Sequence, residues 1–123
     1  MIANTDAVEL AWLAGIIEGE GCFYVNRKDK CPMIRVKMGD RDVVERVAGM
    51  WGSSVGFAKD NRRNHSDMYT ASVYGHAALA WMRKVYAMMG LRRKAKVLEI
   101  LDFCGNKYDN SVPRKKSKAL GTK

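Results

Sequence analysis

The sequence predicts an α+β fold in which antiparallel hairpins are covered by helices on one face, with the element order α-β-β-α-β-β-α-α. Three observations support this prediction. Two pairs of short segments alternate apolar and polar residues, as half-buried strands do. Four other segments carry apolar residues at helical spacing. Each strand-like pair is followed by a helix-like segment, and such hairpins and helices pack as layers.

The first half of the chain predicts a helix, a hairpin and a turn between its strands. Asp6 followed by Glu9 resembles a capping box, and helical spacing predicts a helix over 7–18. Strict alternation predicts strands over 22–28 and 33–38, separated by a polar, proline-containing loop.

The second half repeats this pattern and then adds a further helix. Its expected elements are, in order, a helix capped by Asp40 or Asp42 and ended by Gly52, strands over 54–59 and 68–74 around a polar loop, and helices over 77–89 and 91–103 separated by Gly90. We expect residues 1–105 to form a single domain. Residues 106–123 are expected to be a disordered basic tail, because 113–123 holds five cations and no acid.

Composition points to a polyanionic partner. The chain has 123 residues and a formal net charge of +9, from 22 Lys and Arg against 13 Asp and Glu. Nucleic acid is the first candidate partner and an anionic membrane surface the second. The longest apolar run, 11–17, is too short to span a bilayer, and the N-terminus has no signal pattern, so we expect a soluble, intracellular protein of cytoplasm or organelle. Three cysteines without a CxxC argue against a zinc ribbon and a disulfide framework.

Two acids lie at the end of the first predicted helix, where a negative charge is unfavourable. Glu18 and Glu20 lie at the carbonyl end of the first predicted helix, which carries partial negative charge, so each costs up to about 1 kcal/mol there. A compensating cation is expected, and divalent metals bind such oxygens.

Small residues form a stripe on the same helix. Ala11, Gly15 and Gly19 fall at i, i+4 and i+8, a spacing that lets two helix backbones approach closely. The stripe indicates either a crossing with another helix of the same core or the seam of a homodimer.

The stretch Leu13-Ala14-Gly15-Ile16-Ile17-Glu18-Gly19-Glu20-Gly21 resembles the signature of the LAGLIDADG homing endonucleases. The resemblance extends to the element order and implies a four-stranded antiparallel sheet covered by helices on one face. A single signature implies a homodimer. The resemblance also implies a site-specific, divalent-metal-dependent DNA endonuclease of intron homing. Such an enzyme makes double-strand breaks with short 3′ overhangs at a long pseudo-palindromic site in double-stranded DNA, and uses no small-molecule substrate.

The resemblance also implies residue roles. The last acid of the signature, Glu20, would bind the metal together with the carbonyl of Gly19. Mg²⁺ is the expected ion, and Mn²⁺ is expected to substitute. Glu18 would be structural, although the family has Asp at this position more often.

Two further catalytic positions follow from the resemblance. Asp40, at the junction of the second strand and second helix, would position water near the metals, or would simply cap the helix. A basic residue near the start of the last helix would approach the scissile phosphate. Lys94 is preferred for that role over Arg92 and Arg93.

Strand alternation selects the side chains that would face DNA. With Phe23, Val25, Ile34 and Val36 inward, the formal charges left outward on the first hairpin are all positive. A solvated polar face would show the same alternation. The candidate DNA-binding residues are Tyr24, Asn26, Lys28, Arg35, Lys37, Thr70 and Ser72, with Lys59, Asn61, Arg62 and Arg63 near the second connecting loop.

Two other functions are compatible with the same scaffold. One is an RNA-binding maturase that assists intron splicing, and the other is a non-catalytic DNA-binding protein. The presence of both Glu20 and the basic cluster favours cleavage.

Overall fold

The computed structural model describes residues 6–58 and 67–105, and the predicted basic tail lies outside them. The predicted fold class and element order are confirmed, with one short 3-10 turn added. The elements are α1 (Ala7–Glu20), β1 (Gly21–Asn26), β2 (Cys31–Met38), α2 (Arg41–Trp51), β3 (Gly56–Ala58), β4 (Met68–Tyr74), α3 (Gly75–Val85), the 3-10 turn η2 (Tyr86–Met88) and α4 (Leu91–Cys104).

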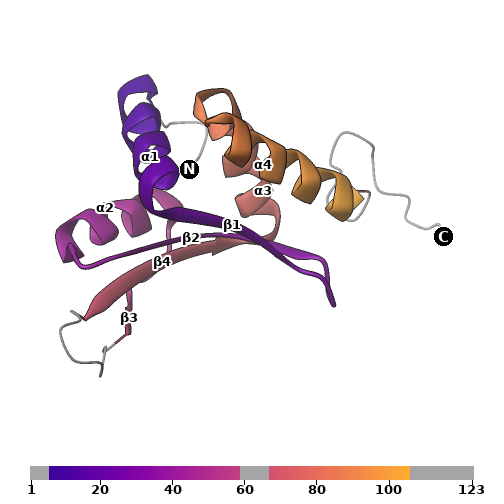
Figure 1. The fold of residues 1–123 in the computed structure, drawn as a ribbon. Helices are drawn as coiled ribbons and strands as arrows, with labels where there is room; N and C mark the ends of the chain where they lie inside the picture. The colour runs from indigo at the N-terminus through magenta and orange to yellow at the C-terminus, as the bar shows by residue number, and fades with distance from the viewer. Residues whose placement is uncertain (1–5, 59–66, 106–123) are drawn as a thin grey trace.

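The four strands form one antiparallel sheet in the order β1-β2-β4-β3. The two hairpins join at the centre, where Ile34 of β2 pairs with Val73 of β4. Figure 1 shows all the helices on one side of this sheet, with the opposite face uncovered. Within the described segments, no helix is long and apolar enough to cross a membrane.

The core lies between the sheet and the helices. Apolar residues at alternate strand positions face the helices because successive side chains of a strand point to opposite faces. Each such side chain contributes about 1.5–3 kcal/mol when fully buried. No polar or charged residue is buried in the described segments. The sheet contributes Phe23, Val25, Ile34, Val36, Ala71 and Val73, and the helices contribute Leu13, Ile17, Trp81, Met82 and Ile100 among others.

The first hairpin differs from its predicted boundaries. β1 ends at Asn26 rather than Lys28, because Asn26 Oδ1 accepts a hydrogen bond from the Lys28 N–H (3.0 Å) and turns the chain. Asp29 Oδ1 accepts from the Cys31 N–H (3.2 Å) and fixes the start of β2 two residues earlier than predicted. Lys28 therefore lies in the turn and not on the strand.

The helix boundaries also differ in places. Asp6 caps α1 as predicted, accepting from the Glu9 N–H at 2.8 Å, but α1 continues to Glu20. The prediction of one helix over 77–89 is wrong at both ends. A left-handed Gly75 (φ 66°) lets the chain enter α3 directly from β4. At the other end Met89 is extended and buried, so the helix cannot continue.

The remaining differences are smaller. Gly52 ends α2 in the left-handed conformation (φ 68°), as predicted. β3 begins at Gly56, two residues later than expected, and α4 runs one residue further, to Cys104.

Candidate functional site

Glu20 is the last residue of α1, and its side chain is exposed. The Gly21 N–H donates to the Ile17 carbonyl, which is the last hydrogen bond of the helix. The later carbonyls have no helical partner. Within residues 6–58 and 67–105, the Glu20 carboxylate takes part in no hydrogen bond or ion pair. An unpaired carboxylate at the negative end of a helix makes this position attractive to a cation.

Glu18, two residues earlier, has a different role. Its Oε1 accepts a hydrogen bond from the backbone N–H of Gly90 (2.9 Å), the residue that precedes α4. Arg93 Nε donates to the Glu18 carbonyl oxygen (3.1 Å) and lies 3.9 Å from its Oε2. Glu18 therefore joins the end of α1 to the start of α4, as the structural role of the first acid requires.

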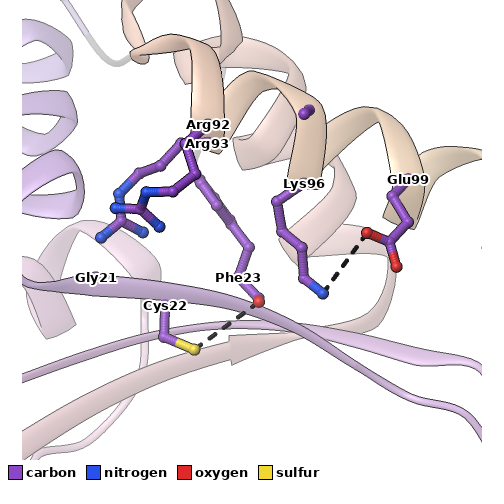
Figure 2. Close-up of a pocket in the computed structure, with 8 residues that line it drawn as sticks. Gly21, Cys22, Phe23, Arg92, Arg93, Lys96 and Glu99 are labelled. Carbon is purple, nitrogen blue, oxygen red and sulfur yellow. Dashed lines mark hydrogen bonds and ion pairs between the residues drawn. The ribbon is translucent and has the colours of Figure 1, made fainter.

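The basic residues of α4 separate into distinct environments. The Arg93 side chain is only 12% exposed and contacts Glu18. Lys94 Nζ lies over the ring of Tyr86, 5.5 Å from its centroid. Arg92 is exposed. Figure 2 shows Arg92 and Arg93 reaching from the first turn of α4 toward Gly21, the neighbour of Glu20.

A hollow of about 360 Å³ separates the start of β1 from the first turns of α4. Arg92, Arg93 and Lys96 line it, whereas Lys94 does not. Lys96 pairs with Glu99 at 3.8 Å and is partly exposed. Sequence reasoning did not single out Lys96. The spacing could have identified it, because Lys96 follows Arg92 by four residues and therefore lies on the same face of the helix.

Asp40 lies at the same end of the sheet as Glu20. Gly21, which follows Glu20, pairs with Val36 of β2, and the chain then leaves β2 at this end to reach Asp40. The Asp40 carbonyl accepts from the N–H groups of Val43 and Val44, but its side chain makes no capping hydrogen bond. Asp40 therefore occupies the N-cap position of α2, as predicted, but its carboxylate does not cap the helix. That carboxylate is exposed.

The helix-free face of the sheet carries the predicted outward residues. Register places Arg35 beside Ser72, with Arg35 Nε 3.3 Å from Ser72 Oγ, and Lys37 beside Thr70. Lys59, Asn61, Arg62 and Arg63 lie outside the described residues. The predicted DNA-binding residues that the structure describes on this face are Tyr24, Asn26, Arg35, Lys37, Thr70 and Ser72, and Lys28 lies in the adjoining turn.

Met33 and Tyr74 are among the residues of this face that the sequence prediction missed. Met33 lies two positions before Arg35, and Tyr74 lies two positions after Ser72, so alternation alone assigns both to the same face. Their apolar character concealed them in a search for polar contacts.

The small-residue stripe of α1 faces away from the core. Ala11, Gly15 and Gly19 are all exposed. A Cβ atom built on Gly15 or Gly19 would meet nothing within 4 Å beyond the local helix backbone. The stripe therefore crosses no helix of the described chain, and the first of its two explanations is wrong.

The available metal ligands form an incomplete set. No group of three His, Cys, Asp or Glu side chains within residues 6–58 and 67–105 is placed to hold an ion. Glu20 supplies a carboxylate, and Gly19 supplies a carbonyl near the end of the helix. Mg²⁺ requires six oxygen ligands and often takes one or two carboxylates with waters and phosphate. These two donors leave the remaining positions around a Mg²⁺ ion to waters or other oxygen ligands.

Comparisons with known proteins identify the domain. The sequence model described as a LAGLIDADG-like domain matches residues 7–88. The fold is similar to that of the archaeal intron-encoded homing endonuclease I-Vdi141I complexed with DNA, at TM-score 0.57 and 17% identity over 79% of this chain and 67% of that one. No curated protein matches the sequence.

The fold is also similar to the homing endonuclease I-CvuI, which was solved with its target in the presence of 2 mM Ca. That match has TM-score 0.54 and 22% identity, over 81% of this chain and 70% of that one. The same endonuclease in the presence of 2 mM Mg, with DNA not cleaved, gives TM-score 0.53 and 21% identity over 85% and 72%.

Proposed function

The chain belongs to the LAGLIDADG-like domain family, and on that basis we propose that it is a site-specific, divalent-metal-dependent DNA endonuclease that acts as a homodimer. The observation that carries this proposal is the exposed Glu20, which has no partner among the described residues, next to the cationic hollow. A metal-dependent phosphodiester hydrolase needs a metal-binding carboxylate and cations for the phosphate, and these two features would supply both.

Glu20 and the Gly19 carbonyl would hold the metal, with Mg²⁺ as the resident ion and Mn²⁺ as a substitute. A bound divalent ion activates water and neutralises charge on the phosphate. Asp40 faces solvent at the same end of the sheet and would accept a hydrogen bond from the attacking water, orienting it.

Arg92 is the residue we assign to the scissile phosphate, supported by Lys96. Arg92 lines the hollow beside Gly21 and is exposed. Its guanidinium can donate two parallel hydrogen bonds to phosphate oxygens. Arg93 is held by Glu18 and Lys94 by Tyr86, so both have competing partners that Arg92 lacks among the described residues.

The homodimer follows from the exposed side of α1. This helix is apolar on both sides, and only one side is covered by the chain's own core. The other side exposes the small-residue stripe and Val8, which is 77% exposed. A two-fold contact along the stripe would bring two Glu20 side chains together. Each would then cut one strand, and the expected products are double-strand breaks with short 3′ overhangs at a long pseudo-palindromic site.

The helix-free sheet face would contact the major groove. Arg35 and Lys37 place positive charge at its centre, as a phosphate-rich partner requires.

The proposal is tested by incubating the protein with a library of randomised duplex DNA in Mg²⁺ or in Ca²⁺ and sequencing the ends produced. We expect cleavage in Mg²⁺ at a pseudo-palindromic site with short 3′ overhangs. Arg92→Gln should lower the cleavage rate by about 100-fold, a loss typical of one transition-state donor, while Arg83→Gln, at an exposed position of α3, should not. Absence of any cut, with preferential binding to structured intron RNA, would instead support a maturase.

A further inference from the structure

An apolar row crosses the helix-free face of the sheet. Tyr24 of β1 pairs with Met33 of β2, and Met33 pairs with Tyr74 of β4. Tyr24 is 50% exposed and Tyr74 54% exposed, although the core lies on the other face of the sheet. The fold therefore gains little from these side chains, and their exposure needs another explanation.

The neighbouring rows carry different chemistry. On one side lies the row Cys22–Arg35–Ser72, in which Ser72 Oγ holds Arg35 through its Nε (3.3 Å). The two terminal nitrogens of that guanidinium then remain for a ligand. On the other side lies Asn26, whose Oδ1 already accepts from the Lys28 N–H.

The apolar row lines a shallow hollow of about 480 Å³. Tyr24, Met33, Tyr74 and Arg35 are among the residues that line it, together with the acidic residue Asp29. The hollow therefore combines an apolar surface with a guanidinium that Ser72 orients through one hydrogen bond.

The charge of the surroundings selects the occupant. Arg35 and Lys37 lie on this face, and the chain carries a net charge of +9, so a polyanion is favoured over an apolar peptide. The apolar group that duplex DNA presents in its major groove is the C5-methyl of thymine, and the group that a guanidinium fork matches is the guanine edge.

We propose that the row Tyr24–Met33–Tyr74 recognises the 5-methyl group of a thymine, and that Arg35 recognises a guanine nearby in the same half-site. This inference rests on the proposed function, because it requires that this face enters the major groove. Met33 and Arg35 are two residues apart on one strand, about 6.8 Å, which is about two base-pair steps where the strand follows the groove.

The experiment selects bound duplexes from a randomised library in Ca²⁺ and then replaces each thymine of the recovered site by deoxyuridine, which removes only the methyl group. One thymine per half-site should be sensitive. Replacement in one half-site should weaken binding about fourfold, the equivalent of about 0.8 kcal/mol for one methyl-sized group, and replacement in both about fifteenfold. A guanine should be enriched about two base pairs away from that thymine.

Variants identify the side chains responsible. Met33→Ala and Tyr74→Ala should bind the thymine and deoxyuridine duplexes equally, whereas Tyr74→Phe should keep the discrimination. Phe57→Ala is the matched control, because Phe57 is 58% exposed but pairs with Tyr69, which alternates with the outward Thr70 and so lies on the opposite face.

The possible failures are distinguishable. If a duplex is enriched and cut but no thymine is sensitive to deoxyuridine, this inference is overturned and the endonuclease assignment stands. The inference is equally overturned if Tyr74→Ala and Met33→Ala still discriminate. If no duplex is enriched at all, the proposed function itself fails.

Discussion

Glu18 and Glu20 stand two residues apart, and the fold gives them opposite surroundings. Glu18 is satisfied by the Gly90 N–H and by Arg93, whereas Glu20 faces solvent beside the cationic hollow. A helix turns about 100° per residue, so residues at i and i+2 must face different ways. The sequence could therefore predict that the two acids separate. It could not predict the partner of Glu18, because Gly90 lies 72 residues away in the chain.

We predict that Glu18→Ala lowers the free energy of unfolding by about 1–3 kcal/mol, because the Gly90 N–H and Arg93 lose their acceptor. Glu18→Gln should lose less, since its amide oxygen can still accept from Gly90. Urea denaturation followed by circular dichroism measures both values. Glu45→Ala, which removes an exposed ion pair with Arg41, is the control and should change stability by less than about 1 kcal/mol. If Glu18→Ala and the unsubstituted protein are equally stable, Glu18 does not stabilise the contact between α1 and α4.

At the scale of elements, the periodic segments were predictable and their ends were not. Alternation correctly assigned Ile34 and Val36 to the core and Arg35 to the outer face. Boundaries failed where one side-chain hydrogen bond decides the conformation, as at Asn26. The end of α3 was missed because burial of Met89 depends on tertiary packing, to which helical periodicity is blind.

The junction between α1 and β1 depends on Gly21. A Cβ atom there would lie 2.8 Å from the Ile17 carbonyl oxygen and 2.9 Å from the Ile17 Cα, and neither backbone atom can move cheaply. We predict that Gly21→Ala lowers the free energy of unfolding by about 1–3 kcal/mol. Gly49→Ala, at an open helical position, should instead be neutral or stabilising by up to about 1 kcal/mol. Thermal denaturation of both variants measures the difference, and a stabilised Gly21→Ala protein would contradict this geometry.

For the whole molecule, one protomer presents half of the proposed site. Glu20 lies at the end of a helix whose small-residue stripe is exposed, and the sheet face lies on the far side of the molecule from the helices. The sequence could predict the stripe and the acid separately. Which surface the stripe occupies could not be derived from spacing, because a buried and an exposed stripe have the same period.

We predict that Gly15→Leu abolishes dimerisation and DNA cleavage while leaving the fold intact, because the position is open in the protomer. Gly49→Leu is the control, because position 49 of α2 also has open space around it, and this variant should remain a dimer. Sedimentation velocity measures the mass of each species. A Gly15→Leu protein that still sediments as a dimer would place the interface on another surface.

The central claim is that Glu20 is the metal-binding acid of a DNA endonuclease. Its most direct test is the single-turnover cleavage rate of Glu20→Gln in Mg²⁺ on the selected duplex, beside Glu45→Gln as an exposed-carboxylate control. We predict that Glu20→Gln binds the duplex as tightly as the unsubstituted protein and cleaves it about 1,000-fold more slowly, a loss of about 4 kcal/mol of transition-state stabilisation. Glu45→Gln should cleave normally. Cleavage by Glu20→Gln at the unsubstituted rate would contradict the claim.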